Sequence, residues 1–224
     1  MDRRQWGCLF EVLETLVLTI VIFLLIQNFV AQPYQVEQQS MEHTLEPGQY
    51  VLVDKLTPRF NDYQRGDIIV FDPPGSAASD PTQVPFIKRI IGLPGDRIDF
   101  RNGDVYVNGV QLDEPYIYDG QPTQAGAQGS TVVVPAGSYF GLGDHRANST
   151  DSRVFGFIPR ANIIGRAWLR YWPLNDLGIL STPTYANVPP AGSAFDPAAG
   201  LAILSFGLAG VAMAGIRGIR ARIA

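Results

Sequence analysis

Ser40 is a candidate nucleophile because it stands alone in the polar stretch "EQQSMEHTL", a few residues after a long apolar segment. A serine hydroxyl attacks a carbonyl at neutral pH only when a nearby base accepts its proton. The chain offers few bases: two histidines, His43 and His145, two lysines, Lys55 and Lys88, and its carboxylates. The first question is therefore which of these groups could lie beside Ser40.

Lys88 has the surroundings that favour such chemistry. It lies in "VPFIKRIIGLPGD", and alternate residues of a strand share a face, so Lys88 shares one with Phe86 and Ile90. Burial on an apolar face disfavours the ammonium ion and lowers the pKa of a lysine by several units from ~10.4. A neutral amine can take the serine proton, as Ser-Lys pairs do on more than one fold. The alternative is a lysine that reaches water from a strand edge, which is how we interpret Lys55 in "YVLVDKL".

The stretch "GDHRANSTDSR" (143–153) is polar and turn-prone, although it lies between the apolar runs "YFGL" and "VFGFIP". A long solvated hairpin loop would explain it. The functional interpretation is a hydrogen-bonded support, in which Ser149 holds a neutral lysine amine and Asp151 pairs with Arg153. The pair Asp144-His145 also permits a Ser-His-Asp triad with Ser40.

Composition and charge argue against several other functions. The 224 residues are 17% charged, with a net charge of −4 and no basic stripe, which argues against nucleic-acid binding. The single cysteine, Cys8, cannot form an internal disulfide bond. One cysteine and two histidines also argue against a Cys/His zinc site. We therefore expect neither a metal ion nor a cofactor.

Two uncharged apolar segments, 15–31 and 198–216, are long enough for membrane-spanning helices. A cleaved signal peptide is the alternative for the first segment, and a soluble helix or frayed tail for the second. Arginines precede the first segment and follow the second, so the positive-inside rule places the intervening chain outside the cytoplasm. The predicted organisation is a cytoplasmic start and anchor (1–31), an extracytoplasmic β-rich domain (32–186), a linker (187–197), a second transmembrane helix (198–216) and a basic cytoplasmic tail (217–224).

Short apolar runs between turn signals predict an antiparallel β domain. Asn102-Gly103 is typical of a two-residue hairpin turn, and Asn108-Gly109 offers a second one. No segment of helical periodicity and useful length lies between the two apolar segments. The predicted strands are 50–56, 67–71, 85–92, 97–100, 105–112, 130–135, 138–143 and 163–172.

Taken together, these stretches resemble the type I signal peptidases. The family's nucleophile motif, serine-methionine-x-proline-threonine-leucine, is similar to "SMEHTL", and the order and spacing of the remaining motifs agree over roughly residues 1–172. The matching stretches are "QSMEHTLEPGQYVLVDKL", "RGDIIVF", "FIKRIIGLPGD", "GDHRANSTDSRVFGFIP" and "IIGRAW". The resemblance implies an all-β fold, with two antiparallel sheets forming the catalytic domain, beside the N-terminal and C-terminal transmembrane helices.

The resemblance also implies roles for single residues. Ser40 corresponds to the nucleophile, Lys88 to the general base, and Ser149 to the serine that orients that lysine. Asp151 and Arg153 correspond to a supporting ion pair. The opening acidic position of the last motif is Asp144, and the candidates to line the substrate pocket are Met41, Phe86, Ile87 and Ile90.

Two positions depart from the family pattern. Where many members have proline, this chain has His43, which could loosen the turn after the nucleophile. Where many bacterial members have a serine whose hydroxyl helps to bind the oxyanion, it has Gln38. Either the Gln38 amide or the Ser40 backbone N–H would then have to donate a hydrogen bond to the oxyanion.

The implied activity is removal of signal peptides from secreted precursors after small residues, at the plasma membrane of a bacterium. Its implied partners are precursors that carry a signal peptide, the lipid bilayer and the secretion translocon. Two alternatives remain open at this point. One is a Ser-His-Asp hydrolase that uses His145, and the other is a non-enzymatic, membrane-anchored β module of a secretion or envelope complex.

Overall fold

The computed structural model describes residues 3–75, 84–185 and 187–190. The chain divides into two compact units, Met1–Ala191 and Gly192–Ala224. The predicted second transmembrane helix (198–216) and the basic tail (217–224) lie outside the described residues. The described residues all belong to the first unit.

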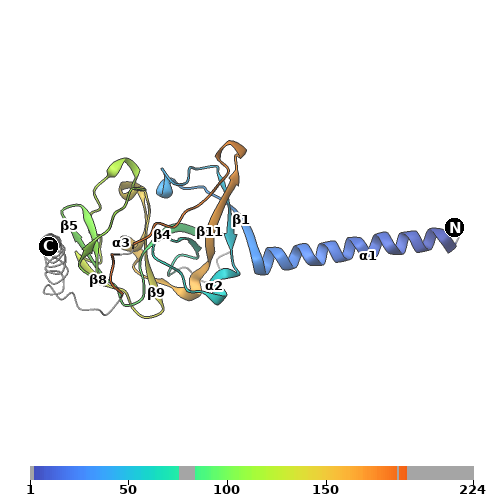
Figure 1. Cartoon of the computed structure of the whole chain (residues 1–224), viewed down its shortest axis with the longest axis horizontal. Helices are drawn as coiled ribbons and strands as arrows, with labels where there is room; N and C mark the ends of the chain where they lie inside the picture. The colour runs from blue at the N-terminus through green and yellow to red at the C-terminus, as the bar shows by residue number, and fades with distance from the viewer. Residues whose placement is uncertain (1–2, 76–83, 186, 191–224) are drawn as a thin grey trace, which may run out of the picture. The chain divides into compact units, whose positions relative to one another are not determined.

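The N-terminal part of the chain forms a helix that ends earlier than predicted. Helix α1 covers Arg3–Leu25, one π-helical turn follows over Ile26–Val30, and Ala31 opens the first strand (Figure 1). The prediction of a helix through residue 31 was therefore wrong at its C-terminal end, because residues 31–35 pair with a neighbouring strand. Among the described residues, none of the helices combines the length and apolarity that a membrane crossing requires, so the predicted span over 15–31 is not confirmed.

The larger sheet has eight strands and is antiparallel throughout. Its order is β1-β2-β11-β3-β4-β9-β10, with β12 paired to β11. Strand β4 lies in the interior of this sheet, between β3 and β9, so both of its edges are hydrogen-bonded. The strands are β1 (Ala31–Gln35), β2 (Tyr50–Asp54), β3 (Ile68–Phe71), β4 (Phe86–Gly92), β9 (Ser138–Leu142), β10 (Ile158–Pro159), β11 (Ile163–Trp172) and β12 (Gly178–Ile179).

The smaller sheet has four antiparallel strands in the order β7-β6-β5-β8. Both predicted hairpin turns are present, since Asn102 and Asn108 have φ of 53° and 52° and a glycine of positive φ follows each. The second turn divides the predicted strand 105–112 into two. The strands are β5 (Arg97–Arg101), β6 (Asp104–Val107), β7 (Val110–Gln111) and β8 (Thr131–Val133).

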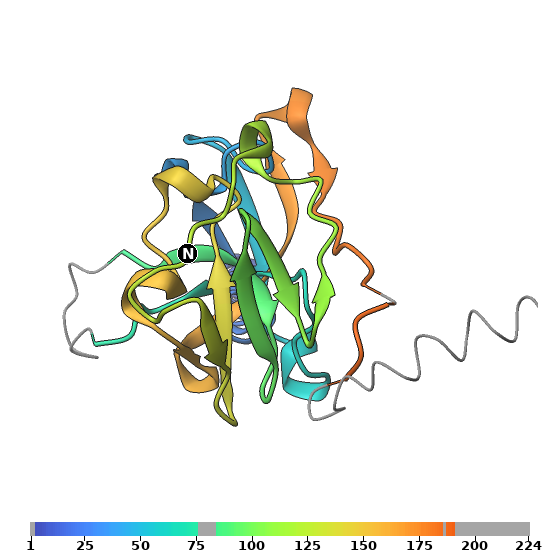
Figure 2. The same cartoon turned by 90° about the vertical axis from the view of Figure 1, so that its left-hand side faces the viewer.

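The two sheets share one hydrophobic cluster, which joins Ile98 and Val105 of the smaller sheet to Ile91, Phe140 and Leu142 of the larger. Figure 2 shows the smaller sheet in front of the larger one. The predicted architecture of two antiparallel sheets is thus confirmed, while β1, β10 and β12 were not foreseen. The helical turns are all short: α2 (Thr57–Phe60), α3 (Ser152–Phe155), and 3₁₀ turns at Gln39–Met41, Tyr118–Gly120, Arg146–Asn148, Arg160–Asn162 and Leu174–Asp176.

The segment after β12 packs across both sheets. Thr182 Oγ1 donates to Asp67 Oδ1 at 2.9 Å beside the larger sheet, and Asn108 Nδ2 donates to the Pro189 carbonyl at 2.9 Å beside the smaller one. Val188 packs against the shared cluster. The described start of the predicted linker, 187–190, is therefore part of the domain.

We predict that Gly165→Ala destabilises the domain. Gly165 lies in β11, where an added Cβ would overlap the Asp54 carbonyl oxygen and lie 2.8 Å from Val53 Cγ1. Because a backbone atom cannot move aside cheaply, the expected loss of unfolding free energy is about 1–3 kcal/mol, measured by denaturant titration. The control is Val133→Ala at an exposed position of β8, expected to cost about 0.5 kcal/mol or less. Equal effects of the two substitutions would contradict the close packing at Gly165.

Candidate active site

Ser40 and Lys88 lie side by side in the folded domain. Ser40 is in the 3₁₀ turn Gln39–Met41 and Lys88 is in β4, and Lys88 Nζ lies 2.6 Å from Ser40 Oγ. A second bond joins Nζ to the Ile87 carbonyl at 2.9 Å. Lys88 is 0% exposed and Ser40 is 3% exposed. An amine and a hydroxyl that are 48 residues apart in sequence therefore meet away from bulk water.

The interior position of β4 explains why Lys88 is dehydrated. It pairs with Ile69 of β3, and Gly141 of β9 leaves so little room that a Cβ there would lie 3.3 Å from Lys88 Cβ. Burial lowers the pKa of Lys88 from 10.5 to about 8, against the opposing charges of Asp151 and Asp144, which raise it. A useful fraction of the amine is thus neutral at mildly alkaline pH.

Two ion pairs fix the loop 143–153: the pair of Asp144 with Arg89 attaches it to β4, and the pair of Asp151 with Arg153 lies within it. Asp144 accepts two bonds from Arg89, at 2.9 Å from Nε and 2.7 Å from Nη2. Asp151 accepts two bonds from the Arg153 guanidinium, at 2.8 Å from Nε and 2.7 Å from Nη2, and two more at 3.1 Å from the backbone N–H groups of Arg153 and Gly143. These paired geometries are strong and directional, so they fix the loop in one arrangement.

Ser149 does not make the bond that the family resemblance implies. Its Oγ is buried and has no hydrogen-bond partner among the described residues, and the second acceptor for Lys88 Nζ is the Ile87 carbonyl. Ser149 nevertheless lies close by, because a Cβ added at Gly143 would overlap Ser149 Oγ and the Ser40 carbonyl oxygen alike. Orientation of the lysine by Ser149 remains a prediction.

His145 is engaged elsewhere and does not form the triad considered above. Its Nδ1 lies 2.6 Å from Glu42 Oε2, and its ring stacks on Tyr118 with centroids 4.3 Å apart. Asp144, the acid that such a triad would need, is held by Arg89. Only the backbone N–H of His145 reaches Ser40, donating to its carbonyl at 3.1 Å.

His43 adopts a backbone conformation that proline cannot adopt. Its φ is 82°, whereas the proline ring fixes φ near −65°. Its N–H also donates to Glu46 Oε1 at 3.2 Å, which a proline could not do. With His43 in place of the family's proline, the backbone of this turn therefore follows a path that a proline at this position would not allow.

Two of the four predicted pocket residues are fully buried and the other two are partly buried. Met41 and Ile90 are fully buried, and the Phe86 ring packs against Phe71 and Phe155. The assignment of Met41, Ile90 and Phe86 to a substrate pocket remains a prediction. Of the four predicted pocket residues, only Ile87 lines a cavity, which is shallow and has a volume of ≈ 30 Å³. The other residues that line it are Tyr34, Gln35, Val36, Glu37, Gln38, Val51, Val70, Val84 and Pro85.

Gln38 is exposed at the edge of this cavity, two residues before Ser40. Within the described part of the chain, the Gln38 side chain makes no hydrogen bond, and the Ser40 backbone N–H donates none. Both groups therefore remain candidates to bind an oxyanion.

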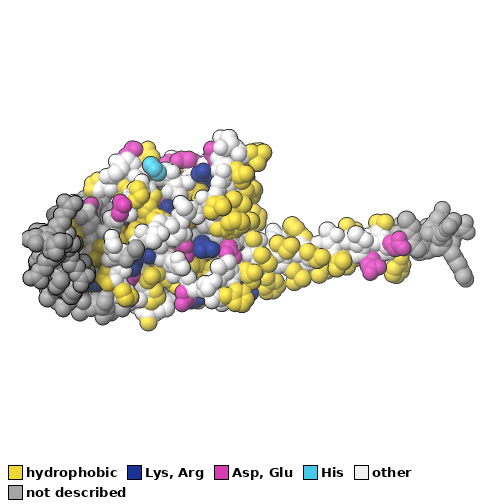
Figure 3. All heavy atoms as spheres, viewed as in Figure 1, with side chains coloured by type: hydrophobic (Ala, Val, Ile, Leu, Met, Phe, Trp, Pro, Cys, Tyr) yellow, Lys and Arg dark blue, Asp and Glu magenta, His cyan; other side chains and the backbone are white. Residues whose placement is uncertain are grey.

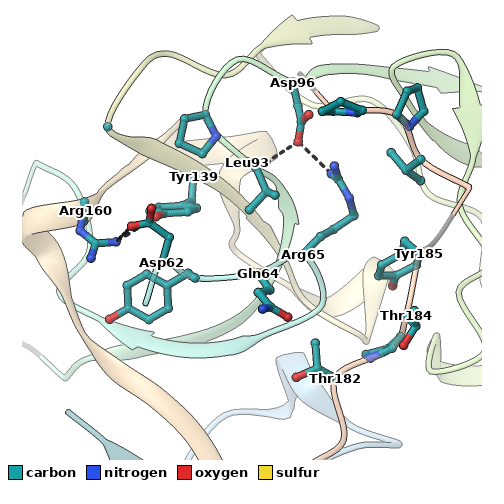
Figure 4. Close-up of a pocket in the computed structure, with 17 residues that line it drawn as sticks. Asp62, Gln64, Arg65, Leu93, Asp96, Tyr139, Arg160, Thr182, Thr184 and Tyr185 are labelled. Carbon is teal, nitrogen blue, oxygen red and sulfur yellow. Dashed lines mark hydrogen bonds and ion pairs between the residues drawn. The ribbon is translucent and has the colours of Figure 1, made fainter. Parts of the chain in front are cut away.

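A larger cavity of ≈ 780 Å³ lies apart from the Ser40–Lys88 pair, which does not line it. Figure 4 shows its walls, on which Arg65 pairs with Asp96 at 2.9 Å and Arg160 pairs with Asp62 at 3.0 Å. Its arginines and acids are already partnered. Neither cavity is lined by Ser40 or Lys88 themselves, but Gln38 and Ile87, two residues and one residue away from them in sequence, line the small cavity. Among the described residues, no three His, Cys, Asp or Glu side chains gather as a metal site would require.

Sequence reasoning missed several residues that hold the site. Arg89, beside Lys88, reaches the Gly66 carbonyl at 3.0 Å and the Thr44 hydroxyl at 3.2 Å in addition to Asp144. Two adjacent basic residues in an apolar strand were a usable signal, because a buried arginine requires a carboxylate partner. The Ile87 carbonyl left no signal in the sequence.

Comparisons with known proteins point to one family. The chain matches a family model described as "Signal peptidase, peptidase S26" over residues 9–172. It is 42% identical over 177 residues to a signal peptidase I of Leptolyngbya laminosa, covering 78% of this chain and 85% of that protein. A probable signal peptidase I-2 of Synechocystis sp. is 40% identical over 171 residues, covering 76% and 77%. The crystal structure of a signal peptidase I from Enterococcus faecalis V583 is 35% identical, with a TM-score of 0.40, and covers 47% of this chain and 97% of that chain.

We predict that the activity of this site rises with pH. Only the neutral amine can accept a proton, so kcat/KM should increase about tenfold per pH unit below the pKa of Lys88 and level off above it, with its midpoint near the pKa of about 8. The measurement is kcat/KM for a peptide substrate from pH 6 to pH 10. A profile that stays flat from pH 7 to pH 9 would contradict a lysine base.

The same pKa shift predicts that Lys88→Met has a pH-dependent effect on stability. Between about pH 8 and 10.5 the folded state releases the lysine proton while the unfolded state keeps it, so wild-type stability rises with pH in this window. The stability of Lys88→Met relative to the wild type should therefore be greatest below pH 8 and decline toward pH 10.5. Denaturant titrations at pH 7, 9 and 10 measure this difference, and a constant value would show that Lys88 is not dehydrated.

Proposed function

The chain belongs to the peptidase S26 family of signal peptidases, which are serine endopeptidases, and we propose that it cleaves signal peptides from secreted precursors with Ser40 as nucleophile and Lys88 as general base. The observation that carries this proposal is the 2.6 Å separation between the buried Lys88 amine and the Ser40 hydroxyl.

In the proposed reaction, neutral Lys88 takes the proton of Ser40 as Oγ attacks the scissile carbonyl. The Ile87 carbonyl accepts one N–H of the amine at 2.9 Å, which leaves the lone pair free to face Ser40. The tetrahedral oxyanion receives hydrogen bonds from the Ser40 backbone N–H and the Gln38 amide. The lysine ammonium then protonates the leaving amine, and a water molecule activated by the same lysine releases the acyl-enzyme.

The shallow cavity lined by Gln38 and Ile87, which are close to Ser40 and Lys88 in sequence, supports selection of small side chains. Its volume is only ≈ 30 Å³, little more than the about 10–15 Å³ that a cavity needs to hold one water molecule. Ile87, Val36 and Val70 give it apolar walls. An alanine methyl group would enter it, whereas a leucine side chain would collide with these walls.

Attachment to a lipid bilayer is supported by exposed apolar surface. From Phe10 to Leu25 the large apolar side chains of α1 are 46–72% exposed, and Figure 3 shows them along the helix. The β11–β12 hairpin adds Trp172, which is 50% exposed, with Leu174, Leu177 and Ile179. A tryptophan among apolar side chains suits the headgroup region of a membrane.

Attachment of this kind would hold the site close to its substrates. A precursor that is inserted by its own signal peptide would present its cleavage site at a similar height above the bilayer, which raises the effective concentration of each partner. Arg3 and Arg4 at the start of α1 favour a catalytic domain on the extracytoplasmic side, where the translocon delivers precursors.

We predict that wild-type protein in detergent or lipid cleaves a model precursor with alanine at the first and third positions before the cut. Ser40→Ala and Lys88→Met should each lower kcat by roughly 10³-fold or more, because each removes a partner of the reaction. Leucine in place of alanine at the first position should abolish cleavage by the wild type. Gel analysis and mass spectrometry of the products measure all three effects.

The matched control is Asp113→Ala, an exposed carboxylate of the described chain for which no hydrogen bond is found. It should cleave like the wild type. Undiminished cleavage by purified Ser40→Ala protein would refute the proposal.

A further inference from the structure

The turn after the nucleophile contains a strained residue whose two neighbours are tied to one loop. His43 has a φ of 82°, which costs a non-glycine residue about 1–3 kcal/mol and persists only where the surroundings impose it. On one side, Thr44 Oγ1 donates to Asp144 Oδ2 at 2.5 Å. On the other side, Glu42 Oε2 lies 2.6 Å from His145 Nδ1. Two consecutive residues of the loop thus hold the residues that flank His43.

His145 is bound to the nucleophile turn twice. Its backbone N–H donates to the Ser40 carbonyl at 3.1 Å, and its side chain reaches Glu42, two residues further along. The ring is fixed from a third direction by stacking on Tyr118, at an interplanar angle of 23°. Tyr118 is itself anchored, because its N–H donates to the Asp144 carbonyl at 3.0 Å.

The contact between Glu42 and His145 contributes little to the free energy of unfolding of the domain. The side chains are 15% and 14% exposed, and neither belongs to a hydrophobic cluster of the described chain. Ion pairs near the surface typically contribute about 0–1 kcal/mol. Its effect is instead local, since it fixes the path of the chain directly after Ser40.

We propose that Glu42 and His145 are positioning residues for Ser40, and this inference rests on the proposed function. By fixing the turn on the far side of Ser40, the pair keeps Oγ within hydrogen-bond reach of the Lys88 amine during turnover. A displacement of a reacting group by about 1 Å can cost up to roughly a hundredfold in rate. The pair touches neither the base nor the scissile bond, so it acts through the position of the turn.

Protonation of His145 leaves this contact in place. The other charged groups around the ring are committed elsewhere, Asp144 to Arg89 and Arg146 to Glu114. Glu42 accepts from the Nδ1–H of a neutral ring and equally from an imidazolium ion. The proposal therefore requires the Nδ1–H tautomer when the ring is neutral, and it requires a donor at this position but no base.

The test compares truncating with conservative variants of the full chain in detergent. Glu42→Ala and His145→Ala should each lower kcat about ten- to a hundredfold, while KM and Tm stay close to the wild-type values. Because one contact is lost in either case, the double variant should be no slower than the slower single variant. Glu42→Gln and His145→Asn keep an acceptor and a donor, so they should retain most of the wild-type kcat. Asp113→Ala is the control.

The opposite outcomes overturn the proposal. Unchanged kcat in both alanine variants, or losses that multiply in the double variant, would show that the pair does not act as one positioning unit. If His145→Asn were as inactive as Lys88→Met, His145 would be a base.

Nuclear magnetic resonance separates this proposal from the proposed function. The ¹⁵N resonances of His145 should report the Nδ1–H tautomer, and the Ser40 amide resonance should shift in Glu42→Ala. If the wild-type protein cleaved no precursor, the proposed function would be refuted. The His145 and Ser40 resonances would still show whether the Glu42–His145 contact positions Ser40. An Nε2–H tautomer of His145 together with an unshifted Ser40 amide resonance would refute the positioning role of Glu42 and His145.

Discussion

The dehydration of a single amine is the constraint on which the rest of the site depends. Lys88 lies in an interior strand, with Ile69 of β3 on one side and Gly141 of β9 close to its Cβ on the other, and no part of it reaches water. Without burial nearly all of the amine would be protonated even at mildly alkaline pH and could not accept the serine proton. The sheet therefore contributes directly to catalysis, because burial in its interior lowers the pKa of Lys88 to about 8.

Arg89 and Arg153 help to keep the pKa of Lys88 low because they pair with the carboxylates near its amine. Asp144 and Asp151 both raise the pKa of Lys88, and an unpaired carboxylate this near would hold the proton on the amine. Each carboxylate is instead bound in a two-bond ion pair, with Arg89 and Arg153 respectively. The same two pairs anchor the loop 143–153, so the groups that shape the site also moderate its electrostatics.

How much the sequence could predict follows from the range of the interactions. Alternating apolar residues and Asn-Gly turns are local signals, and they predicted an antiparallel β domain and two hairpin turns, whereas the division into two sheets was implied by the family resemblance. The meeting of Ser40 and Lys88 was predicted only through the resemblance to a family. Side-chain partners about 100 residues apart, such as Glu42 and His145, leave no local pattern, and the burial of Met41 depends on packing from several strands. The end of the first helix was predicted at Ala31, but Ala31 pairs with Asp54 of β2, a partner that the local sequence does not reveal.

The most direct test of the account is the titration of the Lys88 amine itself. The chain has two lysines, Lys55 and Lys88, so ¹⁵N-lysine labelling gives two Nζ signals, and the one missing from Lys88→Met is assigned. The account predicts that this signal titrates with a pKa of about 8 in the protein without substrate. A titration near the ordinary lysine value of ~10.4 would contradict it.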